Sequence, residues 1–257
     1  MKKQRLIYYS DELNDEFAGD NITAKKIDKY YDYHGGILRK IGRVLLYRVL
    51  AVPVGWLALK IRYGHVIYGK RKLKGYDRYF LYGNHTNNLA DPFIPSMISA
   101  PKGTYVIVHP NNVSMPVLGK LTPCLGALPL PGDMESTRNF INEIEYRYKT
   151  GNSITIYPEA HIWPYYTKIR PFKDMSFRYP VQLKSPVFCF TNVYKKRSIF
   201  GGIKMVTYID GPFQADTGMP VKEQKAWLRE QVYNTMVQRS AENNIEVVKY
   251  IRRETND

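Results

Sequence analysis

The stretch that decides the fold reads YFLYGNHTNNLADPFIP and covers residues 79–95. It opens with a short β-prone run, residues 79–82, which stops at Gly83. It continues to Pro92, which suits the first position of a helix. Sites of α/β sheets favour the edge where a strand ends and a helix begins. We therefore expect the polar residues between Gly83 and Pro92 to lie at the functional edge of a sheet.

Further strand-like runs alternate with helical segments along the rest of the chain. Strands that alternate with helices pack as a sheet whose faces the helices cover. The sequence therefore predicts an α/β fold with a mixed sheet flanked by helices. The predicted strands are residues 104–108, 153–157, 187–190 and 205–209, and the predicted helices are 140–148 and 222–239.

Length and composition limit the class of protein. The 257 residues are 44% hydrophobic, which is enough for one large core and excludes a disordered chain. The two cysteines, Cys124 and Cys189, are far apart in the sequence. This excludes a disulfide framework and a cysteine-based zinc site, and it indicates a reducing compartment.

The net charge of +15 is unevenly distributed. Residues 36–78 hold eleven Lys or Arg against one Asp, a net charge of +10, whereas residues 1–35 carry −1 and residues 79–257 carry +6. The tyrosines are dispersed, so no stacking platform beside a basic groove is visible and nucleic acid is not an expected partner. The same basic region contains the most apolar segment of the chain, residues 44–61.

This apolar segment is typical of a helix that lies in the headgroup region of a membrane. Its longest uncharged run, residues 49–59, has eleven residues, against roughly 20 needed to span a bilayer, so a spanning anchor is not expected. Pro53 and Gly55 should kink it or split it into two short helices. Each Lys or Arg near an anionic leaflet contributes about 1 kcal/mol to attachment. The alternative is an ordinary core helix with a solvated basic face.

Three parts of the chain can therefore be distinguished. Residues 1–36 form a polar, tyrosine-rich lead-in, expected to be a short helix or irregular. Residues 37–75 form a basic and apolar membrane-associating helical segment. Residues 76–257 form the α/β domain.

His85 and Asp91 are the candidate catalytic pair. In a continuous helix their offset of six residues would point them about 240° apart, so they meet only if the segment between them is a loop, which Asn87 and Asn88 favour. A carboxylate that fixes the tautomer of a histidine makes it a competent general base. No serine or cysteine nucleophile is evident nearby, which favours a direct transfer to a substrate hydroxyl over a covalent enzyme intermediate. The alternatives are a structural pair, or Asp91 as the N-cap of the following helix.

The triplet Asn84-His85-Thr86 followed by Asp91-Pro92 resembles the signature of the glycerolipid acyltransferases typified by the 1-acylglycerol-3-phosphate acyltransferase family. The resemblance covers roughly residues 40 to 215, and an ordered set of blocks is far more specific than one motif. The further blocks are Met115-Pro116-Val117-Leu118-Gly119 with Leu125-Gly126-Ala127-Leu128-Pro129, then Ile156-Tyr157-Pro158-Glu159-Ala160, Ile169-Arg170-Pro171-Phe172-Lys173 and Ser185-Pro186-Val187-Phe188.

The resemblance implies a role for each site residue. His85 would take the proton of an acceptor hydroxyl, Asp91 would orient His85, and the hydroxyl would attack the thioester of an acyl-CoA or acyl carrier protein. Glu159 would order the acceptor side, the alternative being a cap or a buried ion pair. No metal or redox cofactor is implied. The implied substrate-binding residues are Asn84, Thr86, Pro158, Glu159, Ala160, Lys168, Arg170 and Lys173.

The chain also departs from the family pattern. Five residues rather than four separate His85 from Asp91, and the arginines that normally end the second and third blocks are absent. Lys168, Arg170 and Lys173 could replace the lost phosphate-binding charge, the alternative being a solvated surface loop. Acceptors other than lysophosphatidic acid therefore stay open. Three aromatic residues could line a lipid path or belong to the core, namely Trp163, Tyr165 and Tyr166.

The expected function is that of an acyltransferase in phospholipid biosynthesis or remodelling. It would act at the cytoplasmic face of the cell membrane, with an anionic membrane surface, an acyl donor and a lysophospholipid acceptor as partners. The alternative is a non-catalytic lipid-binding module on the same fold.

Overall fold

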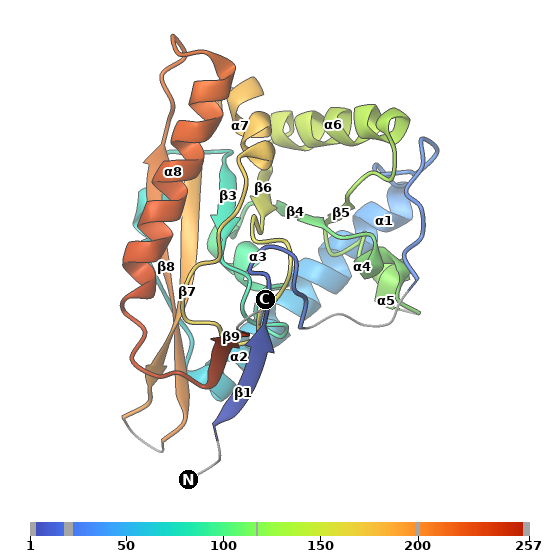
Figure 1. Ribbon diagram of the computed structural model, residues 1–257. Coiled ribbons are helices and arrows are strands. Elements are labelled where there is room, and N and C mark those ends of the chain that lie inside the picture. Colours follow the sequence, from blue (N-terminus) through green and yellow to red (C-terminus); the bar gives the residue numbers. More distant parts are fainter. Residues whose placement is uncertain (1–3, 18–22, 117, 199–200, 254–257) are drawn as a thin grey trace.

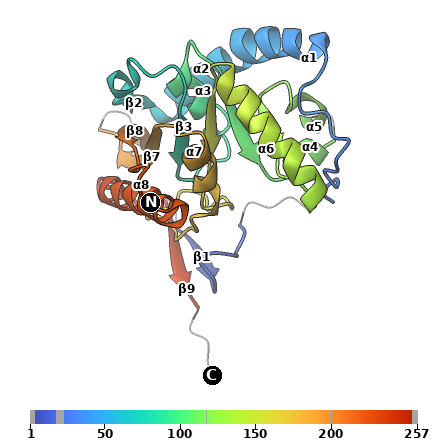
Figure 2. The same cartoon turned by 90° about the horizontal axis from the view of Figure 1, so that it is seen from above.

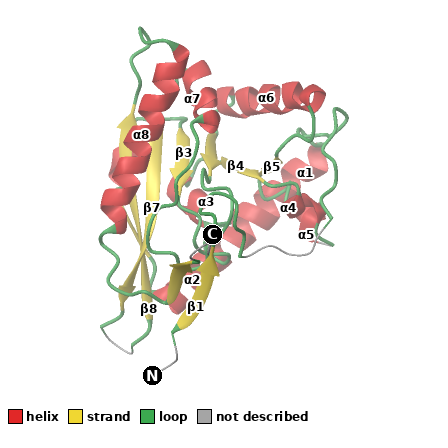
Figure 3. Ribbon diagram, in the orientation of Figure 1, coloured by secondary structure: helices red, strands yellow, loops and turns green. Residues whose placement is uncertain are grey.

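A computed structural model describes residues 4–17, 23–116, 118–198 and 201–253 of the chain. Its centre is a seven-stranded sheet in the order β2-β8-β7-β3-β6-β4-β5, in which only the β7 and β8 pair is antiparallel (Figures 1 and 3). The predicted mixed α/β fold is confirmed. The strands are β2 (Val66–Tyr68), β3 (Phe80–Gly83), β4 (Thr104–Val108), β5 (Ala127–Pro129), β6 (Ser153–Ile156), β7 (Val187–Lys196) and β8 (Ile203–Phe213).

Helices cover both faces of this sheet, and Figure 2 shows α8 and α2 on opposite sides of β7 and β3. Along β3, Phe80 and Tyr82 pack into one core cluster and Leu81 into the other, because successive strand residues point to opposite faces. One cluster lies under α6 (Met134–Lys149), α7 (Arg178–Gln182) and α8 (Val221–Ser240), and the other under α2 (Val52–Tyr63) and α3 (Ile94–Ser99). Short helices complete the chain, namely α4 (Asn111–Ser114), α5 (Leu118–Leu121), η2 (Lys70–Leu73) and η3 (Met175–Phe177).

The apolar segment forms one uninterrupted helix, Ile37–Tyr63, made of α1 (Ile37–Gly42), the π-helical η1 (Arg43–Ala51) and α2. The expected division into two short helices is therefore wrong. Pro53 falls in the first turn of α2, and the π-helical bonding of η1 carries the helix up to it. Gly55 lies against the ring of Phe93, and a Cβ added at Gly55 would be 2.6 Å from that ring. The glycine therefore allows Phe93 to pack closely against the helix.

Only one side of this long helix contacts the rest of the protein. Tyr47 is buried and its hydroxyl lies 2.5 Å from Ser96 Oγ, whereas apolar side chains such as Leu50 and Ile61 are more than half exposed. Its most apolar 18-residue window has a mean hydropathy of 1.7 and is 17% buried, so by length and composition the helix could cross a membrane, in contrast to the expectation from its longest uncharged run. The alternative of an ordinary core helix is wrong for most of its surface.

The lead-in contains a strand where a short helix or irregular chain was expected. β1 (Arg5–Tyr9) pairs in parallel with β9 (Val248–Arg252), forming a two-stranded sheet separate from the main one (Figure 1). Tyr250 of β9 stacks on Trp163 with ring centroids 4.9 Å apart. Residues near both ends of the chain therefore pack against the segment that follows β6.

Candidate active site

Two loops leave neighbouring strands at the same edge of the sheet. β3 and β6 are parallel partners, so the loop of residues 84–93 and the segment of residues 157–174 start side by side. The backbone N–H of Trp163 donates to the carbonyl of His85 at 3.1 Å, and that of Tyr165 donates to the carbonyl of Thr86 at 2.8 Å. The second loop therefore holds the first at His85 and Thr86.

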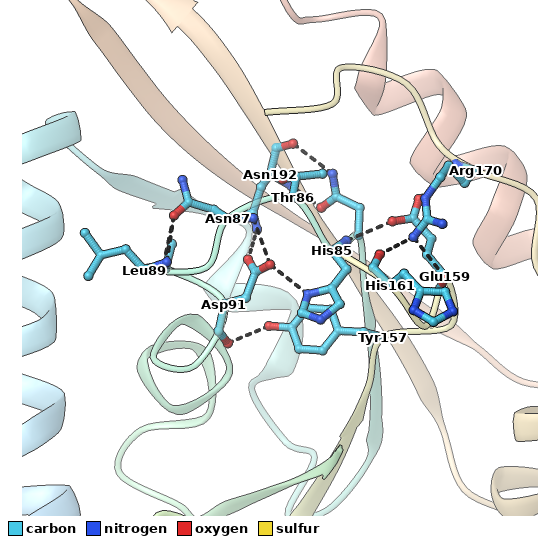
Figure 4. Close-up of polar contacts among 12 residues, drawn as sticks. His85, Thr86, Asn87, Leu89, Asp91, Tyr157, Glu159, His161, Arg170 and Asn192 are labelled. Carbon is cyan, nitrogen blue, oxygen red and sulfur yellow. Dashed lines mark hydrogen bonds and ion pairs between the residues drawn. The ribbon is translucent and has the colours of Figure 1, made fainter. Parts of the chain in front are cut away.

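His85 and Asp91 meet in this loop, as expected if the segment between them is not helical. The imidazole Nδ1 lies 2.8 Å from Asp91 Oδ2, and the backbone N–H of Asn87 donates to the same oxygen at 2.9 Å (Figure 4). The five intervening residues thus keep the pair in contact. The N-cap alternative for Asp91 is wrong, because α3 begins at Ile94 and its N-cap residue is Phe93.

The environment of the pair leaves one side of the histidine accessible. The side chain of Asp91 is 1% exposed and that of His85 is 17% exposed. An ionised carboxylate only accepts hydrogen bonds, so Nδ1 of His85 carries the proton and Nε2 keeps its lone pair. A histidine held in this way can accept a proton from a hydroxyl group placed at its exposed edge.

Tyr157 contacts both members of the pair, a role that the sequence did not indicate. Its ring stacks on His85 with centroids 4.2 Å apart and planes 18° apart, and its hydroxyl donates to the carbonyl of Asp91 at 2.6 Å (Figure 4). One side chain thus fixes both members of the pair. Its only sequence signal was its position directly before Pro158 and Glu159.

The Glu159 carboxylate joins the two loops. Its Oε2 accepts the backbone N–H of His85 and its Oε1 accepts the backbone N–H of Arg170, both at 2.9 Å. Burial raises the pKa of Glu159, and the Arg170 guanidinium and these two N–H groups oppose that effect only in part. With both oxygens occupied, this carboxylate holds the backbone that carries His85.

Arg170 lies inside the protein, in contrast to its expected phosphate-binding position. Its side chain is 1% exposed, it packs over the ring of Trp163, and its guanidinium donates to the carbonyls of Glu12, Glu159 and His161. Its charge therefore faces peptide carbonyls. Lys168 and Lys173 on either side are exposed and form no ion pair within the described part of the chain.

Asn84 and Thr86, expected to bind substrate, are buried and face β7. The side chain of Asn84 exchanges two hydrogen bonds with the backbone of Asn192, at 3.0 and 2.8 Å. The hydroxyl of Thr86 lies 2.9 Å from the hydroxyl of Tyr194. β7 continues past the point where Phe190 faces Gly83, so Asn192 and Tyr194 reach alongside the loop and hold it.

The three aromatic residues after Glu159 do not behave alike. Trp163 is fully buried among Tyr9, Phe17 and Tyr250, so the core alternative holds for it. Tyr166 is buried against Trp163. Tyr165 is half-buried instead, and its hydroxyl lies 2.7 Å from that of Tyr63 at the end of the long helix. In the second block of the resemblance, Val117 lies outside the described residues.

Ala160 occupies a left-handed backbone position next to Pro158 and Glu159. Its φ is +64°, a conformation that costs a residue with a Cβ about 1–2 kcal/mol and glycine nothing. We expect Ala160→Gly to raise the free energy of unfolding by about 0.5–1 kcal/mol, since glycine offsets part of the gain through its freer unfolded chain. Denaturant unfolding measures this difference.

The control is the same substitution in a helix. Ala226 is an exposed residue inside α8, where glycine lowers stability by about 1 kcal/mol. Opposite signs for Ala160→Gly and Ala226→Gly are expected. Two changes of the same sign would contradict the strain at Ala160.

No metal centre is evident in the described residues. They contain no group of three or more His, Cys, Asp or Glu side chains that could hold an ion. Cys124 and Cys189 are both free thiols, and burial raises the pKa of Cys189. The titratable groups gathered at this edge of the sheet include His85, Asp91, Tyr157, Glu159 and Arg170.

Comparison with known proteins indicates the family and the fold. Residues 65–192 match the model of a family described as Acyltransferase, a range that contains both loops. Among solved structures, the chain is similar to the 1-acyl-sn-glycerophosphate (LPA) acyltransferase, PlsC, from Thermotoga maritima. The TM-score is 0.51, the sequence identity is 15%, and 79% of each chain is covered, which establishes a shared fold. No curated protein matches the chain.

Proposed function

We propose, from the premise that residues 65–192 form a domain of the acyltransferase family, that this protein transfers a fatty acyl group from a thioester to the hydroxyl of a lysophospholipid. The observation that carries the proposal is the contact of 2.8 Å between His85 Nδ1 and Asp91 Oδ2, made in a loop that leaves His85 partly exposed. The acyl donor is an acyl-CoA or an acyl carrier protein.

The proposed reaction moves one proton and exchanges one bond. His85 Nε2 takes the acceptor proton as the hydroxyl oxygen attacks the thioester carbonyl, and Asp91 stabilises the imidazolium that forms. When the tetrahedral intermediate collapses, the carbon–sulfur bond breaks, the ester remains on the acceptor, and the thiolate leaves with the proton from His85. The protein forms no covalent bond to the acyl group.

The acceptor headgroup depends on which cations are available to contact its phosphate. Because the guanidinium of Arg170 is occupied by backbone carbonyls, an acceptor phosphate would have to contact other cations, of which Lys168 and Lys173 are the exposed ones nearest in sequence. Lysine binds phosphate as a point charge without the bidentate geometry of arginine. Lysophospholipids with larger headgroups are therefore candidate acceptors beside lysophosphatidic acid.

The long helix would place the reaction at an anionic membrane surface, on the cytoplasmic face. Its exposed apolar side chains are accompanied by exposed Lys40, Arg48, Lys60 and Arg62. Inserted apolar groups together with several cations are sufficient for stable attachment. The end of this helix contacts Tyr165 through Tyr63, beside the loop that carries His85.

Charge placed on the exposed side of the helix should strongly weaken attachment. Leu50 and Leu57 are 58% and 52% exposed, so the double variant Leu50→Glu/Leu57→Glu should fold. Two inserted leucines contribute about 3–6 kcal/mol, so vesicle binding should fall about 10²-fold or more. Sedimentation with phosphatidylcholine and phosphatidylglycerol vesicles measures this, with Met134→Glu as the control because Met134 is 93% exposed on α6. Equal sedimentation of the double variant and the wild type would refute the assignment.

The proposed activity is tested by thiol release from acyl-CoA with the lipid-reconstituted protein. Lysophosphatidic acid, lysophosphatidylcholine and lysophosphatidylglycerol are compared as acceptors, with His85→Ala as the blank. Acceptor-dependent release that is lost in the variant supports the proposal and identifies the headgroup class. No release with either acyl-CoA or an acyl carrier protein donor would favour the non-catalytic lipid-binding module instead.

A further inference from the structure

Asp91 has a second oxygen that faces away from His85, toward the interior of the sheet. Asn192 Nδ2 lies 3.5 Å from Asp91 Oδ1, and Asn192 Oδ1 accepts from the hydroxyl of Thr207 at 2.6 Å. Thr207 Oγ1 in turn lies 2.8 Å from His65 Nε2. We propose that His65, Thr207 and Asn192 are positioning residues that hold Asp91, and through it His85, in the geometry required for proton transfer.

The sheet itself assembles this row of side chains. Asn192 on β7 faces Thr207 on β8 in the strand register, and His65 directly precedes β2, whose Val66 faces Val206 of β8. His65 is 5% exposed, Asn192 is 1% exposed and Thr207 is fully buried. Residues of β7 and β8 and the residue directly before β2 thus form one buried row of polar side chains.

The protons of the row have only one consistent arrangement. Because a carboxylate only accepts, the amide nitrogen of Asn192 must face Asp91 and its oxygen must face Thr207. The single hydroxyl proton of Thr207 goes to that oxygen, so His65 Nε2 must donate to Thr207. Burial lowers the pKa of His65 to about 4, so His65 is neutral at pH 7 and carries its proton on Nε2.

This arrangement gives Asp91 a donor on each side. Its Oδ2 accepts from His85 and from the backbone of Asn87, and its Oδ1 accepts from Asn192. A buried carboxylate that accepts hydrogen bonds on both oxygens has little freedom to rotate away from His85. Residues that act on a catalytic group in this indirect way affect turnover more than substrate binding.

Thr207 is the best position for a test, because its hydroxyl links Asn192 to His65 and can be removed with little change in side-chain shape. Thr207→Val keeps the shape of the side chain and removes the hydroxyl, whereas Thr207→Ser keeps the hydroxyl. The inference rests on the proposed acyl transfer. We expect kcat to fall about 5- to 10-fold in Thr207→Val, the equivalent of one hydrogen bond, with KM changed less than about twofold and Thr207→Ser close to wild type.

A second measurement does not depend on activity. The low-field proton resonance of His85 Nδ1–H, assigned by its loss in His85→Ala, reports the contact with Asp91 directly. It should move upfield in Thr207→Val and stay unchanged in Thr207→Ser. If the wild type has no acyl-transfer activity, the proposed function fails and this resonance alone decides the positioning role.

Two results would overturn the inference. One is an unchanged kcat together with an unchanged His85 resonance in Thr207→Val. The other is an equal loss in Thr207→Val and Thr207→Ser, which would indicate packing rather than hydrogen bonding. If Thr207→Val does not fold, His65→Leu and His65→Gln give the same comparison one link further, because the glutamine amide can donate where the imidazole Nε2 did.

Discussion

Replacing His85 with alanine is expected to reduce acyl transfer by about 10³-fold or more and to leave the protein folded and membrane-bound. General-base catalysis typically contributes about 10²–10⁴-fold to the reaction rate. Within the described loops, no other side chain donates a hydrogen bond to the Asp91 carboxylate, whose second donor there is the backbone N–H of Asn87. The Glu159 carboxylate binds the backbone N–H of His85, and alanine retains that bond. Parallel acyl-transfer and vesicle-sedimentation assays measure the two properties separately.

The matched control for this variant is His161→Ala. His161 lies in the neighbouring loop, is partly exposed, and pairs with Glu16 at 3.6 Å, away from Asp91. It should retain most of the activity. Full activity in His85→Ala would remove the proposed mechanism, and an equal loss in both variants would point to a general disturbance of the two loops.

Asp91→Asn is expected to reduce the rate of acyl transfer by about 10³–10⁴-fold while nearly preserving side-chain volume. An amide nitrogen turned toward His85 donates to Nδ1, so the imidazole proton moves to Nε2 and the lone pair that should accept the hydroxyl proton is lost. An amide oxygen turned the same way restores that tautomer but cannot stabilise the imidazolium by charge. The loss should therefore appear in kcat with little change in KM.

Asp133→Asn provides the same chemical change outside the site. Asp133 is the N-cap of α6, and its carboxylate accepts the backbone N–H of Ser136 at 2.8 Å. Asparagine caps helices about as well as aspartate, so this variant should keep its stability and its activity. If Asp91→Asn is as active as Asp133→Asn, Asp91 is a structural carboxylate and not the partner of a general base.

The longer strands of the central sheet and the helices α6 and α8 could be predicted, because each carries its own pattern. The predicted strand 104–108 matches β4 residue for residue, and the helix predicted at 222–239 differs from α8 by one residue at each end. Short or edge strands gave no such pattern. β5 has three residues, and β1 and β9 pair with each other across the length of the chain and pack against Trp163.

The expected break in the long helix was a different kind of error. Pro53 and Gly55 predict a break when they are considered alone, because proline removes a backbone donor and glycine loosens a helix. In the folded protein, π-helical turns lead up to Pro53, and the ring of Phe93 occupies the space beside Gly55. Packing against α3 thus overrides the local preference.

By itself, the sequence determined the alternation of strands and helices, the location of the polar loop after β3, and the choice of His85 and Asp91 as candidates, because each is a local pattern of spacing and residue type. That the two side chains meet was decided by the folded loop. Only the tertiary structure decided that Tyr157 stacks on His85, that Arg170 faces backbone carbonyls, and that Asn192 meets Asp91. These contacts join segments remote in sequence that parallel strands bring to one edge of the sheet. Side-chain partners across such distances are set by the register of the strands, which no single segment encodes.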